Sequence, residues 1–184
     1  MQIVTGSQAQ LRQDLHRSVG RYRHRVFVQK LGWDVPSQDG IEADQFDRAD
    51  TVYVVGRDAR GQVCGCARLL PTTRPYLLGE VFPQLLNGLP PPASPDIWEL
   101  SRFAATDFNS EATSAVGKIS SEAATELMRA SIVCAAHQGA TRLIMVTNIG
   151  VERLLRRAGF QAHRAGPPMV IDGHPLFACW VSCH

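Results

Sequence analysis

The chain has 184 residues, the length of one domain, and it should bury a substantial core without disulfide bonds. Its formal net charge of +2 does not indicate nucleic-acid binding, and it contains no apolar run of the roughly 20 residues needed to cross a bilayer. The first residues lack the features of a secretory signal, so we expect a cytoplasmic protein. From the chain length we expect a single domain, residues 1–184.

The first half of the chain is predicted to contain one long helix and three strands. Apolar residues recur at helical spacing over Ser7–Leu31, with Ser7 as N-cap and Gly20 as a weak point, because glycine costs about 1 kcal/mol relative to alanine. Residues 32–50 are expected to form a long irregular loop, a kind that is often functional. The predicted strands are Gln2–Thr5, Thr51–Arg57 and Val63–Leu70, the last two joined by a turn at Asp58–Gly61.

The second half alternates between strands and helices. Residues 71–95 are rich in proline and are expected to hold one short helix around Val81–Leu86. The remaining predicted elements are strand Asp96–Ala104, helix Ser114–Gly139, strand Arg142–Val146, helix Val151–Ala158 and strand Pro175–Ser182. This order predicts an α/β protein with one sheet and helices on both faces.

The five cysteines do not suggest a disulfide framework. Cys64 and Cys66 would point to the same face of a strand. No second pair of Cys or His residues follows at zinc spacing, so we expect buried thiols and no metal.

An aromatic and basic cluster ends the first predicted helix. Arg23 and Phe27 are four residues apart and therefore share one helix face, and Trp33 follows closely. Arginine offers a fork for a carboxylate, and the rings offer faces for a cation or a flat group. The structural alternative is a helix with solvated arginines and two core aromatic residues.

Acidic residues gather in the following loop. Asp44 and Asp47 are three residues apart, and two converging carboxylates suit an ammonium or sulfonium group. Alternatively, they cap a helix, bind a weak cation or are simply solvated. Arg68 lies on an apolar strand and needs an acidic partner if buried, whether Asp44, Asp47 or Glu99, although it could also reach solvent from the strand end.

A charged strand carries the candidate base. Glu99, Ser101 and Phe103 point to one face of the predicted strand, and Arg102 points to the other. A glutamate among apolar neighbours is a candidate general base. The competing interpretation is a buried Glu–Arg pair without chemistry.

Together, and in this order, these motifs resemble the acyl-homoserine-lactone synthases of bacterial quorum sensing. The similarity covers nearly the whole chain and rests on Arg23, Phe27 and Trp33 in RHRVFVQKLGW, Asp44 and Asp47 in EADQFD, Arg68, Phe82, Glu99 and Arg102 in ELSRF, and residues 146–160. It implies a single-domain fold like that of the GNAT acetyltransferases, with a mixed, mostly antiparallel sheet and a splayed central strand pair. It also implies a reaction between S-adenosylmethionine, as a substrate and not a cofactor, and an acylated acyl carrier protein.

The resemblance assigns roles to the motifs. Glu99 would be the base, with Ser101 and Arg102 beside it. Backbone N–H groups near Arg102 and Phe103 would stabilise the oxyanion. S-adenosylmethionine would be bound by a set of six residues: Arg23, Phe27, Trp33, Asp44, Asp47 and Arg68.

The acyl chain is expected near Phe82, Phe103, Met145 and Thr147. Relatives that prefer 3-oxo chains carry threonine where Met145 aligns, so we predict an unsubstituted chain of medium length. If the alignment is shifted by two residues, Thr147 takes the place of Met145, and the prediction becomes a 3-oxo chain.

Two features bear on the acyl donor. No glycine-rich pyrophosphate loop precedes the long second-half helix, which favours a donor carried on a protein over acyl-CoA. Arg153, Arg156 and Arg157 could dock an acidic carrier protein, or they could form an ordinary solvated helix face. The rival functions are an acetyl-CoA-dependent N-acetyltransferase and a non-catalytic module that binds acylated carrier protein.

Overall fold

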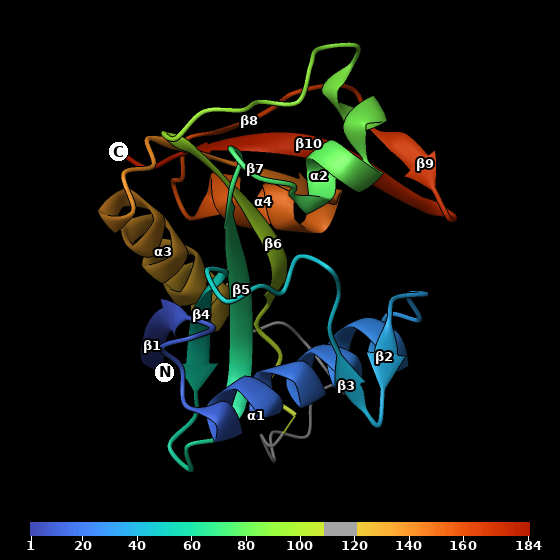
Figure 1. Ribbon diagram of the computed structural model, residues 1–184. Helices are drawn as coiled ribbons and strands as arrows, with labels where there is room; N and C mark the ends of the chain where they lie inside the picture. Colours follow the sequence, from blue (N-terminus) through green and yellow to red (C-terminus); the bar gives the residue numbers. More distant parts are fainter. Residues whose placement is uncertain (109–120) are drawn as a thin grey trace. The chain divides into compact units, whose positions relative to one another are not determined.

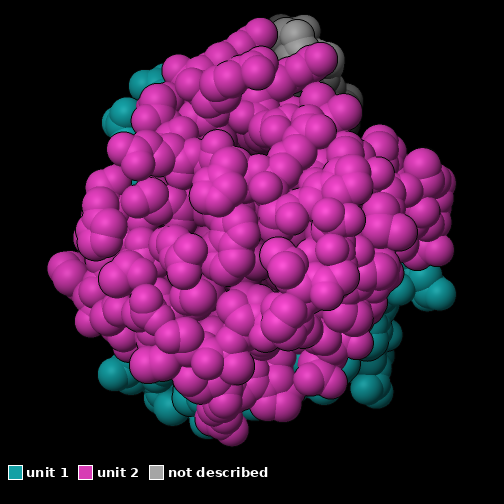
Figure 2. Space-filling view, turned by 90° about the horizontal axis from the view of Figure 1, so that it is seen from above, with its two compact units in different colours: residues 1–68, 102–130 teal, residues 69–101, 131–184 magenta. Residues whose placement is uncertain are grey.

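The computed structural model describes residues 1–108 and 121–184 (Figure 1). The chain divides into two compact units, coloured in Figure 2. Unit 1 comprises residues 1–68 and 102–130, and unit 2 comprises residues 69–101 and 131–184. Strands β5 (Val63–Pro71) and β6 (Ile97–Ala104) and helix α3 (Ser121–His137) each continue from one unit into the other.

Unit 1 combines a helix with antiparallel strands. Besides parts of β5, β6 and α3, its elements are β1 (Gln2–Ser7), α1 (Gln13–Arg23), a π-helical segment (His24–Lys30), β2 (Ser37–Gln38), β3 (Ile41–Glu42) and β4 (Val52–Arg57). β1 pairs with β4 so that Gln2 lies opposite Arg57 and Ser7 opposite Val52, and the strand order is β1-β4-β5-β6. The core between helix and strands contains Val19, Tyr22, Val26, Phe27, Tyr53, Val55 and Cys66. Burial of these large side chains contributes most of the local stability.

Unit 2 contains the parallel strand pair. β6 pairs in parallel with β7 (Arg142–Thr147), from Ile97 opposite Arg142 to Glu99 opposite Ile144. β6 continues to Ala104 and β7 to Thr147, so the two strands pair over only part of their length, as expected for a splayed pair. The further elements of unit 2 are α2 (Leu77–Val81), a 3-10 turn (Pro83–Leu86), β7 (Arg142–Thr147), α4 (Ile149–Arg157), β8 (Ala162–Arg164), β9 (Met169–Ile171) and β10 (His174–Ser182).

The strand pairings confirm the predicted α/β class with a mixed, mostly antiparallel sheet. β10 pairs antiparallel with β7, β8 and β9, whereas β6 and β7 form a parallel pair. Within residues 1–108 and 121–184, no helix has the length and hydrophobicity needed to cross a membrane.

Several predicted boundaries were wrong, and the first helix shows why. Ser7 ends β1 and is no N-cap, because its carbonyl accepts hydrogen bonds from Gln10 and Leu11 in a turn that delays the helix to Gln13. Gly20 does not interrupt α1, and glycine is needed at this position because a Cβ there would lie 2.6 Å from Ile41 Cγ2.

The loop predicted over residues 32–50 contains a small hairpin. β2 pairs with β3, and both turn residues, Asp39 and Gly40, have left-handed backbones with φ of 53° and 73°. An Asp-Gly pair is a strong hairpin signal, so the sequence did contain this information.

Boundaries in the second half also differ from the prediction. Pro83 separates α2, which begins at Leu77, from the 3-10 turn, so the single helix expected over Val81–Leu86 is two shorter elements. The short strands β8 and β9 were not predicted. Residues 114–120 of the predicted long helix lie outside the described residues, and the remainder forms α3.

Candidate active site

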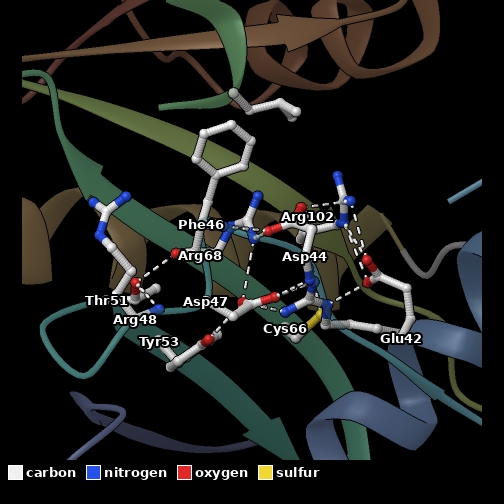
Figure 3. A network of polar contacts seen from close by, with 12 residues as sticks. Glu42, Asp44, Phe46, Asp47, Arg48, Thr51, Tyr53, Cys66, Arg68 and Arg102 are labelled. Carbon is white, nitrogen blue, oxygen red and sulfur yellow. Dashed lines mark hydrogen bonds and ion pairs between the residues drawn. The ribbon is translucent and has the colours of Figure 1, made fainter. Parts of the chain in front are cut away.

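A buried network of three arginines and three carboxylates lies within unit 1 (Figure 3). Each of the six side chains is 5% exposed or less. Its members are Arg23, Arg68, Arg102, Glu42, Asp44 and Asp47. Positive and negative charges are equal in number, which is how a protein can tolerate so many ionised groups away from water.

Arg23, the last residue of α1, joins two of the carboxylates. Its Nε donates to Glu42 Oε2 at 2.5 Å, and its Nη1 and Nη2 donate to the two oxygens of Asp47 at 2.7 and 3.0 Å. Tyr53 also donates its hydroxyl to Asp47 Oδ1 at 2.6 Å. Burial opposes ionisation of Asp47, but the hydrogen bonds and charge of Arg23 outweigh it, so the pKa of Asp47 lies below its usual value.

The other two arginines meet at Asp44. Arg68 Nη1 donates to Asp44 Oδ1 at 2.6 Å and also to Asp47 Oδ1 at 3.2 Å. Arg102 Nη2 donates to Asp44 Oδ2 at 2.9 Å and to Glu42 Oε1 at 3.0 Å. Each of the three carboxylates therefore accepts from two arginines, and the six side chains form one continuous network.

A glycine allows the acidic hairpin to approach the helix. A Cβ at Gly20 would lie 2.6 Å from Ile41 Cγ2, closer than real Cβ contacts come. Because this position is glycine, β3 can lie against α1, and Glu42 then reaches Arg23 and Arg102. The local sequence thus fixes the position of a buried acid.

The two aspartates also fix their own loop. Asp44 Oδ1 accepts from the backbone N–H of Phe46 at 2.9 Å, and Asp47 Oδ2 accepts from the N–H of Asp44 at 2.8 Å. Such local turns use carboxylate oxygens that also bind the arginines. The two aspartates therefore help to fix the conformation of this loop.

Arg102 has an unusual backbone. Its φ is 50°, a left-handed conformation that is costly for a residue with a side chain, and such strain often occurs at functional sites. Its carbonyl accepts from the Cys66 thiol at 3.2 Å, and its guanidinium lies 5.6 Å from the centre of the Phe27 ring. The side-chain ion pairs and the thiol contact hold the residue in this conformation.

The predicted aromatic pair is stacked. Phe27 lies in the π-helical segment, and its ring centroid is 5.0 Å from that of Trp33, with 23° between the planes. Gly32 has φ of 67°, and Trp33 N donates to the Phe27 carbonyl at 2.8 Å, so the chain turns back after the helix. Short π-helices frequently occur at functional sites.

Unit 2 holds the predicted base. Glu99 is fully buried, and its two oxygens accept from the backbone N–H groups of Leu77 at 3.1 Å and Leu78 at 2.6 Å. The side chain thus supports the start of α2. Ser101, two residues further along β6, is 8% exposed.

The predicted acyl-site residues are divided between the two units. Met145 and Thr147 are buried in unit 2, and their spacing of two places them on the same face of β7. Phe82 is half-buried in unit 2, whereas Phe103 is half-buried in unit 1.

The three predicted docking arginines lie on α4. Arg153, Arg156 and Arg157 are all exposed. Asn148 caps this helix by accepting from Val151 N at 3.2 Å. A positive face at a helix C-terminal end is favourable for the helix itself, so exposure alone does not identify a docking site.

Two members of the site were not among the predicted residues. Glu42 was part of the acidic run but was not selected, and Tyr53 was treated only as part of a strand. Glu42 could have been found from the Asp-Gly turn, because a hairpin here makes its strand approach the helix. No comparable pattern of residues pointed to the Tyr53 hydroxyl. No cluster of potential metal ligands occurs among the described residues.

Comparison with known proteins shows the family. Residues 7–184 match the autoinducer synthase family, so the chain belongs to it. It is 52% identical over 181 residues to the acyl-homoserine-lactone synthase of Acinetobacter nosocomialis, covering 98% of this chain and 99% of the relative.

Solved structures agree with this assignment. TofI, in a ternary complex with an inhibitor and MTA, is 48% identical, with a TM-score of 0.87 and coverage of 100% of this chain and 92% of that one. BjaI, a CoA-dependent acyl-homoserine lactone synthase with SAM and isopentyl-CoA, is 27% identical, with a TM-score of 0.83 and coverage of 99% and 82%. An acyl-CoA N-acyltransferase from Pseudomonas aeruginosa, 16% identical with a TM-score of 0.62, shares the fold alone. The predicted acyltransferase fold and family are confirmed.

Proposed function

We propose that this autoinducer synthase transfers an acyl chain from acyl carrier protein to the amine of S-adenosylmethionine and releases an acyl-homoserine lactone. The observation that carries the proposal is the buried six-residue ionic network beside the stacked Phe27–Trp33 pair, in a chain of this family. Buried charges are costly to maintain, so a network of this size favours a binding function over a purely structural one.

The reaction proceeds in two steps. The neutral amine attacks the acyl thioester, an amide bond forms, the carbon–sulfur bond of the thioester breaks, and the carrier thiol leaves with a proton. The methionyl carboxylate then attacks the carbon next to the sulfonium sulfur, closing the lactone as methylthioadenosine leaves. The sulfonium is a good leaving group, so correct positioning supplies most of the second step.

Glu99 is the proposed base for the first step, acting on the amine directly or through a water molecule. Its two oxygens accept hydrogen bonds from the backbone N–H groups of Leu77 and Leu78, which hold the carboxylate in place. Backbone N–H groups near Arg102 and Phe103 are proposed to stabilise the oxyanion. The left-handed backbone at Arg102 supports this, because it departs from the extended geometry of a paired strand.

The proposed S-adenosylmethionine site uses the network and the aromatic pair. Arg23 orients the substrate, and Phe27 and Trp33 provide aromatic walls. Asp44 and Asp47 already accept from two arginines each, which supports a role in ordering Arg68 and Arg102 more strongly than direct contact with the amine.

The donor is proposed to be a carrier protein. The exposed arginines of α4 suit an acidic partner, and residues 105–120, before α3, contain a single glycine, Gly117, instead of a glycine-rich loop. Acyl-CoA is the second candidate, because the related BjaI is CoA-dependent. Reversing Arg153, Arg156 and Arg157 should raise KM for acyl carrier protein and flatten its dependence on salt. Unchanged KM would exclude this face as the docking site.

The acyl chain is proposed to be unsubstituted and of medium length, with Met145 and Thr147 on the wall of its pocket. Because both residues lie on one face of β7, either could contact the chain near the thioester. A dominant 3-oxo product in mass spectrometry would refute the assignment to Met145.

The function is tested by supplying S-adenosylmethionine with matched acyl carrier proteins and acyl-CoA esters, and weighing the products. Acyl-homoserine lactones formed faster from carrier protein would support the proposal. Lactones formed only from acyl-CoA would overturn the proposal that the acyl donor is a carrier protein. An N-acetylated product without S-adenosylmethionine would indicate an N-acetyltransferase, and carrier binding without turnover would indicate a non-catalytic module.

A further inference from the structure

A cavity that opens to the surface lies within unit 1, separate from the ionic network. It measures about 550 Å3 and is lined by residues of β1, α1 and the β4–β5 hairpin. Its volume falls within the usual range of small-molecule sites. None of the six network residues lines it.

The lining of this cavity is strongly basic. Four arginines contribute to it, against a single acidic residue, Asp14. The arginines are Arg12, Arg21, Arg25 and Arg57. Arg12, Arg21 and Arg25 are exposed, and positive charge gathered around one hollow attracts anions to it.

Most of this positive charge is not neutralised within the described chain. Arg12 pairs with Asp14 at 2.5 Å. Arg57 Nε donates to the Gly61 carbonyl at 2.9 Å, and the Arg25 guanidinium lies 4.1 Å from the centre of the Phe108 ring. Neither of these contacts supplies negative charge, and within residues 1–108 and 121–184 no carboxylate forms an ion pair with Arg21, Arg25 or Arg57.

Part of the lining is apolar. Leu11, Leu15 and Val63 line the cavity and pack against the core of unit 1 on their other side. An inorganic anion would leave this surface in contact with water. The lining therefore suits a ligand with an anionic end and an apolar or aromatic body.

We infer that this cavity binds an organic phosphate, with the phosphate among Arg21, Arg25 and Arg57 and the body over Leu11 and Leu15. Arginine forks match phosphate oxygens, and a phosphate ester carries up to two negative charges, as several arginines require. The inference does not depend on the proposed reaction.

The test is isothermal titration calorimetry at low ionic strength with three probes: ADP, octyl phosphate and inorganic phosphate. The variant is Arg21→Gln combined with Arg57→Gln, and the matched control is Arg17→Gln, an exposed arginine of α1 that does not line the cavity. We expect at least one organic probe to bind the protein and the control equally, and to bind the double variant roughly tenfold more weakly or worse. Thermal unfolding verifies folding, and Arg21→Gln alone replaces the double variant if that variant unfolds.

The outcomes separate the possible ligands. Tighter binding of ADP indicates a nucleotide, whereas tighter binding of octyl phosphate indicates an aliphatic phosphate. ADP bound at the S-adenosylmethionine site would be insensitive to Arg21 and Arg57, so equal binding by the double variant would overturn the inference. Absence of binding by both organic probes, or inorganic phosphate binding as tightly as they do, would overturn it as well.

Discussion

Replacing Glu42 by glutamine removes one negative charge from the buried network while keeping the shape of the side chain. Glu42 is 1% exposed and accepts from Arg23 Nε at 2.5 Å and from Arg102 Nε and Nη2 at 3.2 and 3.0 Å. The amide NH2 would face an arginine donor, and the network would carry one uncompensated positive charge. Breaking a buried ion pair from one side costs about 3–5 kcal/mol.

The measurement is urea unfolding together with thermal unfolding. For a chain of this size, each kcal/mol shifts Tm by roughly 2–4 °C, so we expect Glu42→Gln to lower Tm by about 10 °C. The matched control is Glu122→Gln, an exposed position on α3, which should change stability by less than about 0.5 kcal/mol. A loss below about 1 kcal/mol in Glu42→Gln would refute the claim that the network depends on charge balance.

Three further predictions concern the surroundings of the network. Tyr53→Phe removes the 2.6 Å hydrogen bond to Asp47 and should cost about 2 kcal/mol in urea unfolding; no loss would show that the hydroxyl is better solvated than the structure implies. Gly20→Ala places a Cβ 2.6 Å from Ile41 Cγ2 and should destabilise by about 1 kcal/mol, whereas in an Ile41→Ala background it should be neutral or stabilising. Because the pKa of Asp47 is lowered on folding, the stability that it contributes is present above the unfolded pKa of about 3.9 and is lost as pH falls below it; Asp47→Asn should flatten the acid limb of the stability–pH curve, and an unchanged limb would contradict this.

Much of the fold was predictable because its signals are local. Hydrophobic spacing located β4, β5, β6 and β7 to within one residue at each end, and it located the helical region that contains α1. Predicted helix and strand boundaries were wrong where a few backbone hydrogen bonds determine them. After Ser7, for example, the Ser7 carbonyl accepts hydrogen bonds within a turn, and the helix begins later. β8 and β9 are three residues long, too short to show a period, and are defined only by pairing with β10.

The site was predictable as a set of residues but not as a set of contacts. The spacing of Asp44 and Asp47 suggested convergence, yet the partners of Arg102 depend on how closely β3 approaches α1, which Gly20 decides. The φ of Arg102 likewise depends on tertiary contacts, because no local sequence signal favours a left-handed arginine. Non-local packing therefore accounts for what sequence reasoning missed.

The central claim is that one S-adenosylmethionine supplies both the lactone ring and the leaving group. A single-turnover experiment with S-adenosylmethionine labelled only in the four carbons of its aminobutyrate chain, and with acylated acyl carrier protein, tests this most directly. We predict that the label appears in the acyl-homoserine lactone and that unlabelled methylthioadenosine forms in equal amount. Labelled acyl-S-adenosylmethionine that accumulates without methylthioadenosine, or an acylated product without the label, would contradict the account.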